Sequence, residues 1–146
     1  MCIRDRVQDR IMKQIIYMNE NPTVKICGGQ VQMFDDNMNN RGVSSHKSIT
    51  WDQYKENPSH WFINHPTVCY RKSAVLEAGN YDENLKQMCE DFELELRMLK
   101  THGYIYNSPE IVLNYRLHDK QVTHNGGEGG RDKWHNIRMG IIKNLL

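Results

Sequence analysis

Acidic side chains cluster in residues 90–97, EDFELELR, at the start of a segment with helical periodicity. A carboxylate that stays ionised and reaches an acceptor hydroxyl can remove its proton as a general base. Asp91 falls in the first turn of the expected helix, where free N–H groups and the helix dipole favour the ionised form. Acids are also common in first turns for stability alone, so Glu90, Asp91 and Glu93 do not identify a site by themselves. The i,i+4 spacing of Glu93 and Arg97 predicts an exposed ion pair.

Basic and imidazole side chains elsewhere are the other candidates for substrate contacts. His65 precedes Pro66 at the head of an apolar stretch, where it suits either an acceptor or phosphate contact or a structural hydrogen bond. Arg71 ends the same stretch, and its guanidinium could bind phosphate oxygens or simply lie exposed at a strand end. Arg116 and His118 follow a later apolar segment, where His118 suits either a substrate contact or a solvent-exposed position.

Several common site motifs are missing from the sequence. The seven histidines form no HExxH or HxxxH pair, and Cys2, Cys27, Cys69 and Cys89 form no CxxC pair, so a protein-only zinc site is not expected. The four cysteines are interpreted as reduced, mostly buried thiols. There is no GxGxxG and no Walker loop, so a nucleotide site must use other means or lie outside this chain.

Composition limits the class of protein. The 146 residues are 38% apolar and 25% charged, which is typical of one soluble globular domain. A net charge of +1 and the lack of a basic stripe with aromatic residues argue against a nucleic-acid partner. No run approaches the roughly 20 apolar residues that span a bilayer.

Periodicity predicts strands that alternate with helices, and therefore an α/β domain. Residues 9–20 read as a helix capped by Asp9, with Ile11, Ile15 and Met18 on its apolar face. Residues 24–34 read as a strand, in which Gly28-Gly29 predicts a bulge or a close approach by another group. Residues 35–47 read as a loop.

The rest of the chain continues the alternation. A short helix is expected within residues 49–56, begun by Ser48 or Thr50, followed by a buried strand at 67–71 and a helix that Ser73 caps. The clearest helix is 90–102, with Phe92, Leu96 and Leu99 on one face and Gly103 as its terminator. Two short strands at 104–107 and 111–117 flank a turn, and 131–146 reads as a final helix.

Three segments in this order resemble the family-2 glycosyltransferases, which have the A-type glycosyltransferase fold. They are DRIMKQIIYMNENPTVKICGG, HPTVCYRKSAVLEAGNYDENL and EDFELELRMLKTHGYIYNSPEIVLNYRLH. The resemblance covers residues 9–124 and implies the C-terminal part of a nucleotide-diphospho-sugar transferase domain, with a mixed sheet flanked by helices. Residues 1–8 are then a foreign or truncated start, and 125–146 are a loop and C-terminal helix.

The resemblance implies an inverting transfer of a sugar from a nucleotide-sugar donor to an acceptor hydroxyl, with Asp91 as the catalytic base. Glu90 is its motif partner, and His65, Arg71, Arg116 and His118 are expected to contact substrate, His118 near the metal or diphosphate. The acceptor would be a glycan or lipid-linked glycan in cell-surface polysaccharide synthesis. The protein would be cytoplasmic or peripheral at the inner face of the membrane.

The resemblance also has a gap. Family members carry a nucleotide-binding half and a DxD-type motif for a divalent cation, Mg or Mn, before the segment that starts at Asp9. Neither is present, so we expect a fragment that is inactive alone. A non-catalytic remnant or interaction module of the same ancestry is the alternative. A hydrolase using Glu90 and Asp91 ranks last, because adjacent residues on one helix rarely face one sugar from two sides.

Overall fold

The computed structural model describes residues 4–59, 61–85, 89–118 and 130–146. Its centre is a mixed sheet in which β6 (Tyr104–Arg116) and β2 (Ile26–Phe34) run parallel. β1 (Arg4–Arg6) pairs antiparallel with β6, and β3 (Asn40–Val43) pairs antiparallel with β2. Two short antiparallel strands complete it: β4 (Ile49–Thr50) on β6 and β5 (Cys69–Tyr70) on β2. The predicted α/β class, with a mixed sheet flanked by helices, is confirmed.

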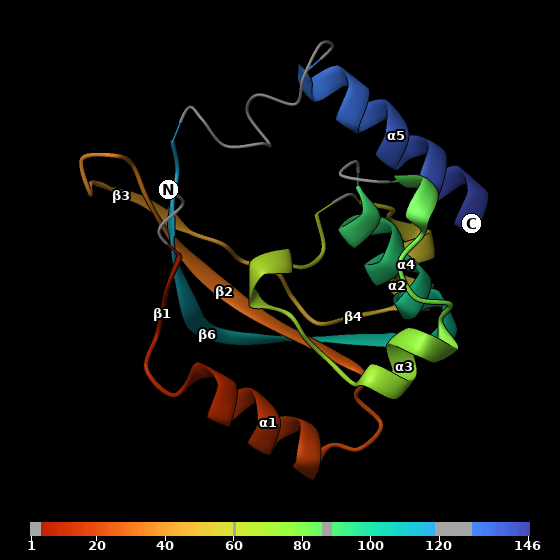
Figure 1. Ribbon diagram of the computed structural model, residues 1–146, viewed down its shortest axis with the longest axis horizontal. Coiled ribbons are helices and arrows are strands. Elements are labelled where there is room, and N and C mark those ends of the chain that lie inside the picture. Colours follow the sequence, from red (N-terminus) through yellow and green to blue (C-terminus); the bar gives the residue numbers. More distant parts are fainter. Residues whose placement is uncertain (1–3, 60, 86–88, 119–129) are drawn as a thin grey trace.

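Helices cover both sides of this sheet (Figure 1). α1 (Arg10–Glu20) lies on one side, whereas α4 (Glu90–His102) and α5 (Gly130–Leu145) lie on the other. The shorter helices are α2 (Trp51–Glu56) and α3 (Lys72–Glu77), with 3₁₀ turns η1 (His65–Thr67) and η2 (Glu83–Leu85). The main apolar core forms on the α4 side, and a smaller cluster forms under α1.

α4 matches its prediction in length and in face. Phe92, Leu96 and Leu99 are all buried in the main core. Gly103 follows with a φ of 79°, the left-handed conformation that glycine adopts easily at a helix end. Glu93 and Arg97 form the expected ion pair at 2.6 Å, but it is largely buried and not exposed, because Arg97 also donates to backbone carbonyls before the helix.

The face of α1 was predicted correctly for Met18, which is buried, and wrongly for Ile11 and Ile15. Ile11 and Ile15 are 43% and 44% exposed, and the buried side chains are Arg10, Gln14 and Met18. The two polar residues are buried because they have partners on η1: Arg10 donates to the Pro66 carbonyl at 3.0 Å and Gln14 to the Thr67 carbonyl at 2.8 Å. Asp9 makes no side-chain cap and lies at a φ of 62°.

The paired glycines of β2 show both features that the sequence predicts. A Cβ on Gly28 would lie 2.9 Å from the Asn107 Oδ1 atom, and one on Gly29 would lie 2.8 Å from a Val112 methyl carbon. The register between β2 and β6 also shifts at this point. Because the irregularity accommodates residues 108–110, the two strands expected there form one long β6 instead.

Smaller boundaries also differ from the predictions. The expected loop at 35–47 contains β3, since polar residues suffice for an exposed edge strand. The strand expected at 67–71 is only β5, because Thr67 belongs to η1. α3 starts at Lys72 after an N-cap at Arg71, so Ser73 is not its cap. Thr50 does cap α2, with a complete capping box to Gln53.

Candidate functional site

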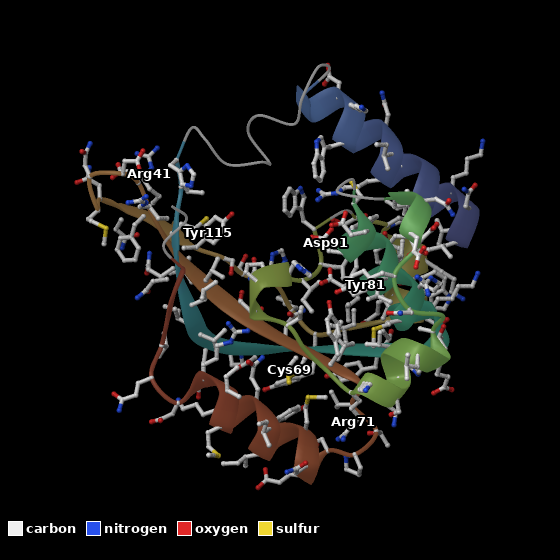
Figure 2. All side chains as sticks on the ribbon, in the orientation of Figure 1. Arg41, Cys69, Arg71, Tyr81, Asp91 and Tyr115 are labelled. Carbon is white, nitrogen blue, oxygen red and sulfur yellow. The ribbon has the colours of Figure 1, made fainter. Side chains whose placement is uncertain are left out.

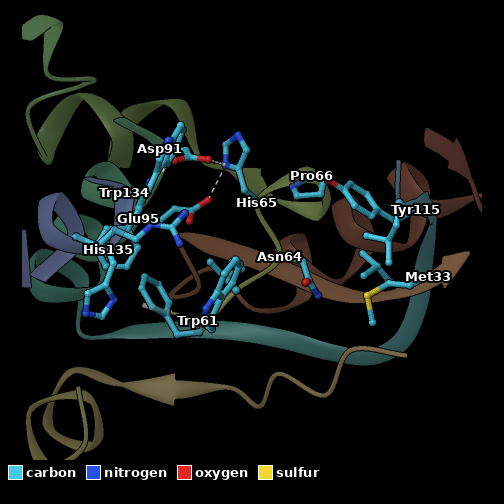
Figure 3. Close-up of a pocket in the computed structure, with 16 residues that line it drawn as sticks. Met33, Trp61, Asn64, His65, Pro66, Asp91, Glu95, Tyr115, Trp134 and His135 are labelled. Atoms are coloured by element: carbon cyan, nitrogen blue, oxygen red, sulfur yellow. Dashed lines mark hydrogen bonds and ion pairs between the residues drawn. The ribbon is translucent and has the colours of Figure 1, made fainter. Parts of the chain in front are cut away.

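A cavity of about 610 Å³ lies where the parallel strands β2 and β6 end. Its floor includes Met33 of β2 and Tyr115 of β6, and its walls come from residues 61–66, α4 and α5. Figure 3 shows these side chains converging from both halves of the chain. The carboxyl ends of parallel strands are where open α/β sheets bind ligands.

One wall of the cavity holds two carboxylates beside an imidazole. Asp91 and Glu95 are four residues apart on α4, so they share a helix face. His65 of η1 lies against both: its Nδ1 is 2.8 Å from Glu95 Oε1 and 3.9 Å from Asp91 Oδ2 (Figure 3). The hydroxyl of Tyr70 donates to the same Glu95 oxygen at 3.0 Å.

The two carboxylates have different surroundings. Glu95 is 3% exposed, and burial raises the pKa of its carboxyl above the ordinary value, although the His65 hydrogen bond opposes that shift. Burial, and then the neighbouring Glu95, also raise the pKa of Tyr70, so its hydroxyl stays protonated and donates. The side chain of Asp91 is 31% exposed, and its Oδ1 accepts from the Phe92 N–H at 2.7 Å. Asp91 is therefore the acid that a ligand in the cavity can reach.

An aromatic and cationic group, Trp61 and Arg138, also borders the cavity. Trp61 is 60% exposed beside the cavity. The guanidinium carbon of Arg138 on α5 lies 4.9 Å from the Trp61 ring centroid and 5.4 Å from that of Phe92. The Nε of Arg138 is buried without a hydrogen-bond partner in the part of the chain that the structure describes. The guanidinium as a whole supplies a positive charge at the edge of the cavity.

The structure brings together two of the residues expected from sequence, Asp91 and His65. Glu90 starts α4 half-buried and does not line the cavity. Arg116 and His118 flank the cavity-lining Leu117 without lining it themselves, and Arg116 lies 3.5 Å from Asp36.

Arg71 lies elsewhere in the molecule. Figure 2 shows it on the α1 side of the sheet, whereas Asp91 is on the other side. Its guanidinium donates to the carbonyls of Met18 and Val24, at the end of α1 and beyond it. Its contact with the diphosphate stays a prediction, and so do the substrate contacts of Glu90, Arg116 and His118.

Four further residues belong to this site that were not expected from the sequence: Glu95, Tyr70, Trp61 and Arg138. Glu95 could have been found, since it is four residues after Asp91 and lies between Leu94 and Leu96, where an acid needs a partner. Tyr70, Trp61 and Arg138 carry no comparable signal, because their contacts depend on how distant segments pack.

Neither a metal-binding cluster nor a membrane-spanning helix is found among the described residues. Within them, no group of three His, Cys, Asp or Glu side chains is placed to hold a metal ion. Across the same ranges, no helix combines the length and apolar character needed to cross a membrane.

Comparison with known proteins places this geometry in context. No family model matches the chain. It is 32% identical over 127 residues to an uncharacterised glycosyltransferase of Haemophilus influenzae, covering 83% of this chain and 44% of that protein. It is 30% identical over 122 residues to an amylovoran biosynthesis glycosyltransferase of Erwinia amylovora, covering 82% of this chain and 44% of that protein.

A third relative has a more specific name. It is the UDP-Gal:alpha-D-GlcNAc-diphosphoundecaprenol beta-1,3-galactosyltransferase of Escherichia coli, 27% identical over 115 residues, which are 76% of this chain and 40% of that protein. The chain therefore spans less than half the length of these curated relatives. Over most of its own length it is similar to one part of proteins named as glycosyltransferases.

Proposed function

We propose that the chain forms the acceptor-side part of an inverting glycosyltransferase, with Asp91 as the catalytic base. The donor would be a nucleotide sugar, and the acceptor a glycan or lipid-linked glycan of cell-surface polysaccharide or O-antigen synthesis. The observation that carries this proposal is a half-exposed Asp91 in a cavity where His65 and Glu95 lie beside it. The glycosyltransferase names of the relatives support the reaction class.

In the proposed step, an acceptor hydroxyl in the cavity loses its proton to the Asp91 carboxylate. The hydroxyl oxygen forms a bond to the anomeric carbon of the donor, and the nucleoside diphosphate leaves from the opposite side with the bonding electron pair. General base catalysis of this kind contributes about 10²–10⁴-fold. Asp91 suits the role better than Glu95, whose carboxylate is buried and already accepts from two side chains.

His65 is assigned a positioning role. Its Nδ1 lies against Glu95, which fixes the ring orientation, and the same edge of the ring lies beside Asp91. At 3.9 Å this nitrogen is beyond hydrogen-bond distance of Asp91 Oδ2, so His65 would orient the Asp91 carboxylate by lying beside it.

Trp61 and Arg138 at the edge of the cavity would bind the acceptor. The exposed face of Trp61 offers an apolar surface for the C–H face of a sugar ring. Arg138 offers a cation for phosphate oxygens. A diphosphate is present in the acceptor named for the Escherichia coli relative, and a lipid-linked acceptor would bring the protein to the inner membrane surface.

A divalent cation, Mg or Mn, remains part of the proposal through the donor diphosphate. The described residues do not fit such an ion, since they contain no suitable cluster of three ligands. We therefore derive no step through it from this chain.

The test compares two identical substitutions at equivalent helix positions in the gene product that carries this sequence. Asp91→Asn changes the second residue of α4, and Asp52→Asn changes the second residue of α2, whose side chain is 85% exposed. We expect transfer from a panel of nucleotide sugars to fall about 10²–10⁴-fold for Asp91→Asn and to be unchanged for Asp52→Asn. Donor affinity, measured by calorimetry, should be equal in all three proteins.

Full activity of Asp91→Asn would remove Asp91 from the mechanism. A wild-type protein that binds acceptor glycans without transferring any sugar would favour the non-catalytic interaction module instead.

A further inference from the structure

Two cysteines face each other on the α1 side of the sheet. Cys27 of β2 and Cys69 of β5 are direct partners in the antiparallel register. Directly opposed residues project to the same face of the sheet, and their Cα atoms are about 4.5–5.5 Å apart. A disulfide needs a Cα separation of about 4.4–6.8 Å, so the register places this pair within bridging distance. Both thiols are free in the structure.

The surroundings give the two sulfurs different roles. The Cys27 thiol donates a hydrogen bond to Cys69, and with the cations of Arg10 and Arg71 it lowers the pKa of Cys69 to about 6. The same hydrogen bond, followed by burial, raises the pKa of Cys27. The Gln14 amide reaches the Cys27 sulfur at 3.7 Å and helps to hold it in place. The lowered pKa of Cys69 and its cationic neighbours Arg10 and Arg71 make Cys69 the more reactive thiol of the pair.

The Cys69 side chain is also accessible. Cys69 is half-buried and lines a surface pocket of about 390 Å³ with Met18 and Arg71, whereas Cys27 lies beneath it and is buried. This pocket shares no lining residue with the cavity that contains Asp91. Figure 2 shows Cys69 between β2 and α1, away from Asp91. A small oxidant can reach Cys69 without entering the candidate active site.

We propose that Cys69 and Cys27 form a thiol oxidation site that a hydroperoxide converts to an intramolecular disulfide. The Cys69 thiolate attacks the peroxide oxygen and breaks the O–O bond, which gives a sulfenic acid and a hydroxide that takes up a proton. The Cys27 sulfur then attacks the Cys69 sulfur, the S–S bond forms, and the sulfenic oxygen leaves as water. With hydrogen peroxide, two thiols and one peroxide give one disulfide and two waters.

The experiment treats the reduced protein with one equivalent of hydrogen peroxide at neutral pH, blocks the remaining thiols, and maps the peptides by mass spectrometry. We expect a Cys27–Cys69 linked peptide and an intact mass lower by about 2 Da before blocking. Cys69→Ser should abolish the product. Cys27→Ser should leave a sulfenic acid on Cys69 that dimedone captures, because the resolving thiol is gone.

Cys89→Ser is the matched control, since Cys89 is buried in the main core and burial raises the pKa of its thiol. This variant should still form the Cys27–Cys69 disulfide. A second measurement needs no variant: in the wild-type protein at neutral pH, Cys69 should react with iodoacetamide at least tenfold faster than Cys89. Equal alkylation rates, or a disulfide that joins any other pair, would overturn the proposal.

Discussion

Replacing Glu95 should separate the effect of its charge from that of its shape. Glu95→Ala removes the acceptor for the Tyr70 hydroxyl and for His65 Nδ1. An unsatisfied buried donor costs about 1–3 kcal/mol. His65 is 39% exposed and can turn to water, so most of the loss comes from Tyr70 and from the emptied volume. We expect the free energy of unfolding to fall by about 2–3 kcal/mol.

Glu95→Gln should behave differently, because the amide keeps an acceptor oxygen in the same place. The charge itself is unfavourable in this position, since burial raises the pKa of the Glu95 carboxyl. The loss of charge-assisted hydrogen bonds and the relief of desolvation therefore oppose each other. We expect Glu95→Gln to lie within about 1 kcal/mol of the wild type in urea unfolding.

The pH dependence gives an independent check of the sign. Above the ordinary glutamate pKa of 4.5, the unfolded chain has released a proton that folded Glu95 still holds. The free energy of unfolding of the wild type should therefore fall as pH rises from that value toward the folded pKa, with a slope of at most about 1.4 kcal/mol per pH unit from this group. Glu95→Gln should lose that slope.

The matched control is Glu77→Gln, at an exposed position near the end of α3. It should retain both the stability and the pH slope of the wild type. Equal stability of Glu95→Ala and Glu95→Gln would refute the assigned hydrogen bonds. An unchanged pH slope in Glu95→Gln would refute the assigned burial of its charge.

Two further predictions concern packing. Gly28→Ala should lower the free energy of unfolding by about 1–3 kcal/mol, because its Cβ would lie 2.9 Å from both Asn107 and Ile63. Gly140→Ala should raise it by about 0.5–1 kcal/mol, because a Cβ there meets open space in α5. Urea unfolding of both variants checks the difference in sign. Leu96→Ala should lower the free energy of unfolding by about 2–5 kcal/mol, because Leu96 is fully buried. Ile15→Ala should lower it by less than about 1 kcal/mol, because Ile15 is 44% exposed. Comparable losses in urea unfolding would contradict the orientation of α1.

Much of the fold could be predicted from local signals that agree with one another. Residues 90–102 combine a consistent apolar face with a terminating glycine, and the observed α4 has those bounds. Thr50 was one of the two predicted caps of α2, and close approach was one of the two readings of Gly28, since caps and glycines in strands leave local signals. The full length of β6 was not predicted, because a proline at residue 109 indicates a break in the strand unless the irregular pairing with β2 is known.

The candidate site was predictable only in part. Asp91 and His65 stand in recognisable motifs, and the cavity contains both. Glu95 reads as an ordinary helix acid until the packing of η1 against α4 gives it two partners. Arg138 enters the site only because α5 packs beside Phe92 and Trp61, a contact between segments that are far apart in the chain.

The inward residues of α1 support the candidate site from the opposite side of the sheet. A hydrophobic pattern places isoleucines inward, yet the inward residues are Arg10 and Gln14, whose hydrogen bonds end on the carbonyls of Pro66 and Thr67. Those carbonyls belong to η1, the turn that also carries His65. The buried polar residues of α1 therefore fix the backbone from which His65 reaches Glu95 and Asp91. Because Arg10 and Gln14 are held by long-range hydrogen bonds, these bonds orient α1 together with the packing of Met18 and Tyr17.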